Sequence, residues 1–353
     1  MQHCFGLNYS GGPVNAFNRL ISYSKYEYSV IRQFNPAGGI DRSLINHFIK
    51  EIKIHKPQLI HIRGLGNEGF HAALAAKIAG VPHILVSIHG THRDLKYHSN
   101  PIKKWIMVNL FERLTLNFAT DIVTVCEYAS KRNFLKPYKN KLRGYVSNGV
   151  PLPELLDISK KESIKNTLNI EKELKIGICV SRITVEKGYL ILAEALKKID
   201  KPNNKFLLFI VGGGDENGEI SSYYSDLKFI KVQFIGHIDN VGEYLSISDF
   251  FIFPSLHENL SNALIEAMSY QLPVVATNVG GNTEVLEKGG GILVKPNDSD
   301  DLAEKIKYFL KNDDCIEFMA KLARTNIEEN YSLNSMVKSW EALYESILRK
   351  EKV

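Results

Sequence analysis

Cysteine is scarce in this chain of 353 residues and occurs at only four positions, far apart in the sequence. These positions are Cys4, Cys126, Cys179 and Cys315. Structural zinc sites need closely spaced pairs of cysteines, and small disulfide-bonded domains need many cysteines within a short stretch. Neither pattern is present, so we expect reduced thiols, as in the cytosol.

Long apolar runs are missing as well. The hydrophobic stretch at residues 106–111 is enclosed by Lys104 and Glu112, whereas a membrane-spanning helix needs roughly 20 apolar residues in succession. The first Lys or Arg is Arg19, and no apolar run follows a basic start, so a secretory signal is not expected. These absences predict a cytoplasmic protein.

Acidic residues are few in the first half of the chain. Residues 1–160 contain 21 Lys and Arg against 10 Asp and Glu, whereas residues 161–353 contain 23 against 29. Such a basic half is either a solvated face or a surface that meets an anionic membrane, nucleic acid or a phosphorylated substrate. Nucleic acid is not expected, because the basic residues are not interleaved with aromatic ones and no binding motif occurs.

The basic segment at residues 101–118 has a helical pattern that allows two interpretations. It contains Lys103, Lys104 and Trp105 together with several large aliphatic residues. We favour a helix packed on the first sheet. The alternative is a helix that lies on a membrane surface.

Short runs rich in Val, Ile and Phe alternate with helical patterns, which predicts an α/β protein with parallel sheets built from βαβ units. The strands that we expect are residues 59–63, 83–89 and 121–127, and then 175–183, 205–211, 232–236, 249–254 and 273–277. Residues 5–8 leave room for only a short first strand, which we expect at the edge of its sheet. Two doubly wound, Rossmann-like domains follow from this pattern.

The join between the domains is expected at residues 151–169, where Pro151 and Pro153 precede a polar stretch. We therefore predict a first domain at residues 1–155 and a second at 156–335. Residues 333–349 have apolar side chains at helical spacing. We expect the end of the chain, residues 336–353, to be a helix that packs back toward the first domain.

The most informative pattern runs through residues 253–285, FPSLHENLSNALIEAMSYQLPVVATNVGGNTEV. It predicts a strand, a loop with Glu258, a helix that begins near Ser261 and carries Glu266, and a second strand and loop. The first amides of such a helix lack intrahelical acceptors and form a site suited to a phosphate. Glu258 is then better placed to accept hydrogen bonds from sugar hydroxyls, and Glu266 from a ribose.

Two other loops follow predicted strands of the second half. Arg182 and Lys187 lie in SRITVEKG, where a guanidinium and an ammonium can clamp a diphosphate without a metal ion. The segment VGGGDE around Gly213 permits close approach of the backbone to a ligand, although three glycines also serve any tight turn. Doubly wound sheets bind ligands beyond the carboxyl ends of their strands, where all these loops lie.

In these motifs the chain resembles the retaining GT-B glycosyltransferases, in particular family four, the glycosyl transferases group 1. The frame PSxxE…EAM…PVVAT…GG around Glu258 and Glu266 and the motif SRxxxEKG carry most of the resemblance. In the first half, Gly11 and Gly12 resemble a glycine-rich loop after the first strand, and His89 resembles a histidine at a strand end.

The resemblance implies a UDP- or GDP-linked sugar donor that is held mainly by the second domain. Arg182 and Lys187 would contact the diphosphate, and His89 would approach the donor sugar beside the acceptor. The catalytic residues that we expect are His89, Arg182, Lys187 and Glu258, and the substrate-binding residues are Gly11, Gly12, Gly213, His237, Asn259, Leu260, Ser261, Asn262 and Glu266. The sequence Asn259-Leu260-Ser261 departs from the Gly-Phe-Gly or Gly-Phe-Pro of many family members, which tunes or obstructs the donor pocket.

No cofactor and no metal ion are expected, because the DxD motif of metal-dependent transferases is missing from suitable positions. The predicted reaction moves a hexose-type sugar from a nucleotide diphosphate, with retention of configuration, to a hydroxyl of a lipid-linked glycan. The expected setting is bacterial surface polysaccharide or lipopolysaccharide synthesis at the inner face of the cytoplasmic membrane. The alternatives are transfer to a soluble sugar or sugar phosphate, and a catalytically silent GT-B scaffold protein.

Overall fold

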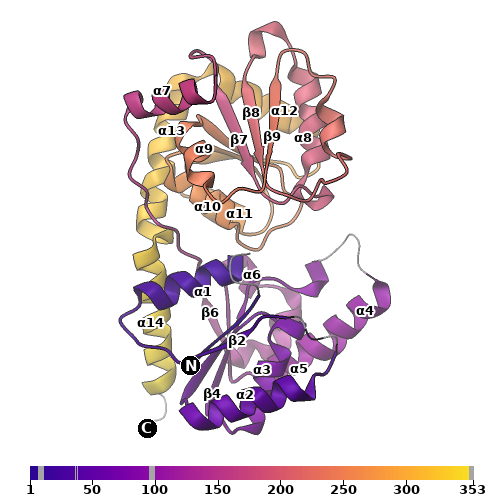
Figure 1. Ribbon diagram of the computed structural model, residues 1–353, viewed down its shortest axis with the longest axis vertical. Coiled ribbons are helices and arrows are strands. Elements are labelled where there is room, and N and C mark those ends of the chain that lie inside the picture. Colours follow the sequence, from indigo (N-terminus) through magenta and orange to yellow (C-terminus); the bar gives the residue numbers. More distant parts are fainter. Residues whose placement is uncertain (7–11, 36, 38, 95–99, 350–353) are drawn as a thin grey trace. The chain divides into compact units, whose positions relative to one another are not determined.

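The computed structural model describes residues 1–6, 12–35, 37, 39–94 and 100–349, and it divides into two compact units (Figure 1). Unit 1 comprises residues 1–149 and 333–353, and unit 2 comprises residues 150–332. Each unit contains a six-stranded sheet whose recorded pairings are all parallel, with helices on both faces. The prediction of two doubly wound parallel-sheet domains is therefore confirmed.

The sheet of unit 1 has the strand order β2-β1-β3-β4-β5-β6. Its strands are β1 (Gln2–Phe5), β2 (Val30–Gln33), β3 (Leu59–Arg63), β4 (His83–Ile88), β5 (Asp121–Thr124) and β6 (Leu142–Tyr145). Its helices are α1 (Gly12–Tyr23), α2 (Arg42–His55), α3 (Phe70–Ile78), α4 (Pro101–Ile106), α5 (Glu112–Phe118), α6 (Glu127–Ser130) and α14 (Leu333–Arg349). Helices α2, α3 and α5 share a core with one face of the sheet, and α1 and α14 share one with the other face.

The expectation for the first strand is wrong in its residue range and in its position in the sheet. The strand is Gln2–Phe5, and it lies between β2 and β3 rather than at an edge. Its start is polar, yet Gln2 and His3 are buried. The side-chain Nε2 of Gln2 donates to the Tyr344 hydroxyl, and Arg63 donates to the side-chain Oε1 of Gln2. These long-range partners make the burial of Gln2 tolerable, and no local apolar pattern could reveal them.

The sheet of unit 2 has the strand order β12-β11-β10-β7-β8-β9. Its strands are β7 (Ile176–Val180), β8 (Leu207–Val211), β9 (Lys231–Gly236), β10 (Phe250–Phe253), β11 (Val274–Thr277) and β12 (Gly291–Val294). Its helices are α7 (Ile158–Thr167), α8 (Tyr189–Ile199), α9 (Val241–Ile247), α10 (Asn262–Ser269), α11 (Gly281–Leu286), α12 (Ser299–Lys311) and α13 (Asp313–Asn326). Helices α9, α10, α11 and α13 join the core on one face, and α8 and α12 join the core on the other.

All eight strands expected from apolar runs are present, with ends that differ by a few residues. The three strands that the sequence analysis missed are β2, β6 and β12, and each lies at an edge of its sheet. Edge strands are exposed on one side and lack the continuous apolar run of a central parallel strand. Burial within these three strands is correspondingly incomplete.

The segment expected to be a linker contains a helix, α7, which corrects that prediction. Asp157 caps its start by accepting a hydrogen bond from the Lys160 amide. The helix is mostly polar, but Ile164 and the following Leu168 pack against the core of unit 2. By contrast, the predicted helix at residues 333–349 is present as α14, and its apolar stripe lies in the core of unit 1.

Candidate functional site

The strand order of unit 2 reverses between β7 and β10, which are paired neighbours at the middle of the sheet. The chain runs from β7 through β8 to β9 in one direction and from β10 through β11 to β12 in the other. Open α/β sheets bind ligands beyond the carboxyl ends of their strands at such a reversal. The loop with Lys187 follows β7 and the loop with Glu258 follows β10, so the two strongest candidates flank this point.

Lys187 and Glu258 form a direct ion pair, with 2.6 Å between the lysine Nζ and the glutamate Oε1. Their side chains are 18% and 10% exposed, so the pair is largely shielded from water. The Lys187 ammonium also lies 5.8 Å from the centre of the Phe253 ring at the end of β10. Lys187 is predicted to contact a diphosphate and Glu258 a sugar, yet in this structure the two side chains pair with each other. The sequence analysis assigned them separate roles and did not anticipate the pair.

The loops that carry this pair are locked together by their backbones. The amide of Leu256 donates to the Glu186 carbonyl over 2.9 Å. Gly188 has a φ of +76°, and a Cβ on it would lie only 1.9 Å from the Pro254 carbonyl oxygen. Only glycine permits this approach, which brings Lys187 next to the end of β10. Gly188 belongs to the motif SRITVEKG, but its sequence context alone does not reveal this role.

Replacing Gly188 by alanine should destabilise unit 2 by on the order of 3 kcal/mol, because left-handed backbone strain adds to a severe overlap with the Pro254 carbonyl. Gly236→Ala is the matched control. Gly236 has a similar φ of +78°, but nothing lies within 4 Å of a Cβ added there. Its cost should be the strain alone, about 1–2 kcal/mol. Urea unfolding of both variants measures the difference, and equal losses would show that the close approach of the two loops does not matter.

Helix α10 begins where the sequence predicted, with Ser261 as its N-cap. The Ser261 hydroxyl accepts a hydrogen bond from the Leu264 amide over 3.3 Å. The loop before the cap is fixed by Gly281, whose amide donates to the Asn259 carbonyl over 2.8 Å. A Cβ on Gly281 would lie 2.1 Å from that carbonyl oxygen, which explains the second glycine after β11. The start of the helix, with its partly positive end, thus has a defined place beside Glu258.

The other predicted residues of this group lie on the same helix and loop. Asn259, Leu260 and Asn262 are half-buried. Glu266 is half-buried in the second turn of α10. Burial and the nearby Glu266 carboxylate raise the pKa of Tyr270, one turn further on. The helix therefore carries Glu266 on a partly accessible face.

Arg182, Gly213 and His237 lie in three loops that follow the adjacent strands β7, β8 and β9. The Ile183 amide donates to the Gly213 carbonyl over 2.8 Å, and the Gly212 amide donates to the Gly236 carbonyl over 2.9 Å. These hydrogen bonds connect the three neighbouring loops to one another. Arg182 and His237 are exposed. None of the described residues accepts a hydrogen bond from the Arg182 guanidinium, so its charge is available to a ligand.

In unit 1, His89 directly follows β4 and is half-buried. Its Nε2 atom lies 3.4 Å from the Ser87 hydroxyl. Loss of hydration, together with the positive charge of Arg63, lowers the pKa of His89 to about 3. The imidazole is therefore neutral near pH 7 and can exchange hydrogen bonds without carrying charge. Gly12 is the first residue of α1, whereas Gly11 lies outside the described residues.

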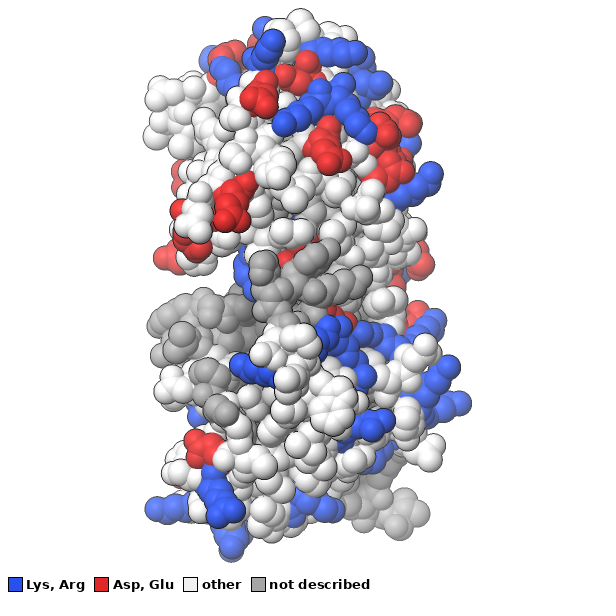
Figure 2. Space-filling model, turned by 90° about the vertical axis from the view of Figure 1, so that its right-hand side faces the viewer, with Lys and Arg blue, Asp and Glu red and all other residues white. Residues whose placement is uncertain are grey.

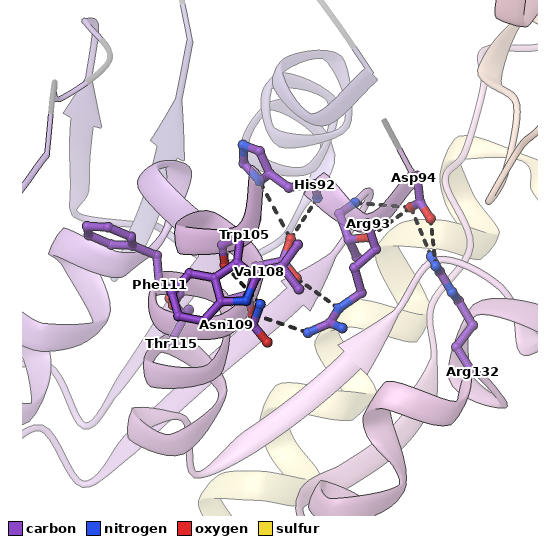
Figure 3. A network of polar contacts seen from close by, with 11 residues as sticks. His92, Arg93, Asp94, Trp105, Val108, Asn109, Phe111, Thr115 and Arg132 are labelled. Atoms are coloured by element: carbon purple, nitrogen blue, oxygen red, sulfur yellow. Dashed lines mark hydrogen bonds and ion pairs between the residues drawn. The ribbon is translucent and has the colours of Figure 1, made fainter. Parts of the chain in front are cut away.

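The loop after His89 is held by a network that sequence analysis missed (Figure 3). Glu112 is fully buried, and its carboxylate accepts hydrogen bonds from the His92 amide at 2.6 Å and from Arg93 Nε at 3.1 Å. Arg132 donates to both carboxylate oxygens of Asp94, at 2.9 and 2.6 Å. The sequence contains one indication of this network, because Glu112 is an acidic residue at an inward-facing position of a helix.

Within the described ranges, no group of three or more His, Cys, Asp and Glu side chains is arranged to hold a metal ion. Glu258 is instead occupied by Lys187. Whether the reaction needs a metal ion is a separate question, and the absence of such a requirement remains a prediction.

Two family models match the chain. The model described as "Glycosyl transferases group 1" matches residues 160–329, and "Glycosyl transferase 4-like" matches residues 22–125. The capsular polysaccharide biosynthesis glycosyltransferase CapM of Staphylococcus aureus is 26% identical over 306 residues, which cover 84% of this chain and 78% of that protein. The UDP-Gal:alpha-D-GlcNAc-diphosphoundecaprenol alpha-1,3-galactosyltransferase of Escherichia coli is 26% identical over 321 residues, which cover 86% of this chain and 79% of that protein.

Among solved structures, Anabaena Alr3699/HepE in complex with UDP is similar in fold, with a TM-score of 0.78 and 17% identity. The similarity covers 98% of this chain and 99% of the Anabaena chain. The family matches fall in both units, and the motifs around Lys187 and Glu258, in the match at residues 160–329, flank the reversal point of the sheet of unit 2. The chain belongs to the glycosyl transferases group 1 family and is a glycosyltransferase of the GT-B fold.

Proposed function

We propose that this glycosyltransferase moves a hexose-type sugar from a nucleotide diphosphate to a hydroxyl of a lipid-linked glycan, with retention of configuration and without a required metal ion or cofactor. The observation that carries the proposal is the Lys187–Glu258 pair at the reversal point of unit 2, beside the start of α10. A cation, a carboxylate and a helix start within one small region suit a phosphate and sugar hydroxyls together.

The chemical roles follow from the charges. Lys187, Arg182 and the first amides of α10 offset the negative charge that grows on the diphosphate as its bond to the sugar breaks. Glu258 accepts hydrogen bonds from the sugar hydroxyls, and Glu266 accepts from the ribose. The acceptor oxygen attacks on the face that the diphosphate leaves, and the acceptor proton passes to the departing phosphate oxygen. The anomeric carbon exchanges one oxygen for another, so no protein nucleophile is needed.

The acceptor and the setting are proposed from charge and from relatives. The printed name of the Escherichia coli relative contains a diphosphoundecaprenol-linked sugar, and CapM is named for capsular polysaccharide biosynthesis. Unit 1 contains 24 Lys and Arg against 11 Asp and Glu, whereas unit 2 contains 20 against 28. Positive charge of this size suits an acceptor with a lipid pyrophosphate at an anionic bilayer. We place the reaction at the cytoplasmic face of the membrane, in surface polysaccharide or lipopolysaccharide synthesis.

A thermal-shift panel tests the donor. UDP, GDP, ADP and their common sugar conjugates are added first without metal and then with Mg²⁺. A ligand at 100 times its dissociation constant adds about 2.7 kcal/mol, which should raise the midpoint of unit 2 by about 5–10 °C. We expect one nucleotide class to give this shift without metal. A shift that appears only with Mg²⁺ would overturn metal independence, and none with any nucleotide would favour the silent scaffold.

The acceptor is tested with the donor so identified. A polyprenyl-pyrophosphate sugar and a set of soluble sugars and sugar phosphates are offered in parallel, and the anomeric configuration of the product is read from its NMR coupling constants. We expect transfer to the lipid-linked acceptor with retention. Transfer only to a soluble acceptor would replace the lipid-linked proposal, and an inverted product would contradict the same-face mechanism.

A further inference from the structure

Helix α4 presents a stripe of large apolar side chains to solvent. Ile102 is 71% exposed, Trp105 is 65%, Ile106 is 37% and Leu110, just beyond the helix, is 44%. The spacing of these positions places them along one side of a helix. Helix α4 itself contributes no buried residue. Single exposed apolar residues are ordinary, but four within nine positions form a contiguous patch.

The opposite side of the same segment accounts for its packing. A π-helical turn, Met107–Phe111, continues α4 into α5, and Met107 and Phe111 are buried in a cluster with Phe70. The segment at residues 101–118 therefore has two apolar sides, of which the core of unit 1 needs one. The expected packing on the first unit is present in the second half of this segment. It does not explain the apolar side chains on the outer side of α4.

The surroundings of this stripe are basic. Lys103 and Arg113 are exposed beside it. Residues 101–143 contain nine Lys and Arg against three Asp and Glu. Two of those acids, Glu112 and Asp121, are buried in ion pairs with Arg93 and Arg143. Figure 2 turns toward the viewer the side of the molecule on which α4 lies, and basic side chains prevail there over acidic ones on unit 1.

We propose that the outer side of α4 docks on an anionic lipid bilayer. Ile102, Trp105, Ile106 and Leu110 would enter the interface between headgroups and acyl chains, and the neighbouring lysines would meet anionic headgroups. An anionic bilayer offers both an apolar interior for the stripe and negative headgroups for the flanking positive charge, which is why we prefer it to a protein partner. The docking surface lies entirely on unit 1, so it is independent of the donor site on unit 2. Docking would give the proposed sugar transfer access to a lipid-linked acceptor.

The π-helical turn that continues α4 is hydrogen-bonded to the loop that follows β4. Arg93 donates to the Val108 carbonyl in the π-helical turn over 3.2 Å while it also holds the buried Glu112 carboxylate. Figure 3 shows the Arg93 side chain next to Val108. A π-helical turn displaces carbonyls from the regular ladder, which makes Val108 available to Arg93. A membrane contact at α4 would therefore lie one helical turn from a residue bonded to the loop that follows His89.

The chain contains two tryptophans, which makes the proposal directly measurable. Trp105 is exposed on α4, whereas Trp340 is 4% exposed and lies 4.4 Å from His61, centre to centre. In a Trp340→Phe variant, all tryptophan emission comes from Trp105. We expect a blue shift when vesicles of phosphatidylcholine with phosphatidylglycerol are added, a smaller one with phosphatidylcholine alone, and reversal at high salt. Trp105→Phe, which keeps the buried Trp340, should give no shift.

Vesicle co-sedimentation provides a second measurement that does not depend on the Trp340 substitution. Joint replacement of Ile102 and Trp105 by serine should weaken binding about tenfold or more, the affinity equivalent of one large apolar side chain. Ile54→Ser on α2 is the matched control, because Ile54 is 62% exposed on the same unit and lies outside the stripe. Thermal stability should not fall in either variant.

Three outcomes would overturn the docking proposal. One is failure of the wild-type protein to bind anionic vesicles. Another is an equal loss of binding in Ile54→Ser. The third is a blue shift of Trp105 that depends on protein concentration without lipid and accompanies a dimer in sedimentation, which would assign the stripe to a second copy of the chain. Nucleotide binding is read separately by thermal shift, so failure of docking and failure of the sugar-transfer proposal are distinguishable.

Discussion

Glu258→Ala is expected to reduce sugar transfer to background while leaving the affinity for the nucleoside diphosphate unchanged or higher. The carboxylate is the group proposed to hold the sugar, and two charged hydrogen bonds at about 1.5–3 kcal/mol each correspond to a loss of at least about a hundredfold in kcat/KM. The affinity for the nucleoside diphosphate does not fall, because removal of Glu258 releases the Lys187 ammonium from its 2.6 Å pair and leaves it free for phosphate.

Transfer kinetics with the identified donor and calorimetric titration of the nucleoside diphosphate measure the two quantities separately. Glu258→Gln keeps the volume and one acceptor oxygen, so it shows how much of the loss is due to charge. Glu287→Ala removes an exposed carboxylate elsewhere in unit 2 and should leave both quantities unchanged. Wild-type turnover in Glu258→Ala would remove Glu258 from the sugar site, and a large loss of diphosphate affinity would mean that the residue mainly orders the loop.

The central strands were predictable because burial on both faces of a parallel sheet demands continuous apolar runs. Strand β3 was expected at its observed bounds, and β10 and β11 within a residue or two. Strand β1 was misplaced because its polar residue Gln2 is buried through partners on β3 and α14, far away in the sequence. Local patterns report the local environment, and they fail where burial depends on a distant partner.

The candidate site shows the same division. The motifs around Lys187 and Glu258 marked both residues, but a separation of 71 positions contains no information on distance, so the ion pair could not be predicted. The neutral state of His89 depends on burial beside Arg63, which comes from another strand. In α4, apolar spacing alone cannot distinguish a buried side from an exposed one. Only the tertiary structure shows that Met107 faces the core and Trp105 faces solvent.

Lys187→Ala is expected to weaken binding of the nucleoside diphosphate more than the loss of one contact requires. A charged hydrogen bond contributes about 1.5–3 kcal/mol, which is roughly a ten- to hundredfold change in affinity. The substitution also leaves the Glu258 carboxylate, which is 10% exposed, without the cation that now neutralises it. A nearly buried negative charge beside the phosphate site then repels the ligand, so the loss should lie at the upper end of this range.

A double-mutant cycle isolates this repulsion. The Lys187→Ala, Glu258→Ala double variant should bind the nucleoside diphosphate more tightly than Lys187→Ala alone, because it removes the unpaired carboxylate as well. Calorimetric titration of the wild type, both single variants and the double variant yields the coupling energy. Additive losses would show that the two side chains do not share the phosphate site. Unchanged affinity in Lys187→Ala would exclude Lys187 from it and leave Arg182 and the start of α10 as the remaining anion-binding groups.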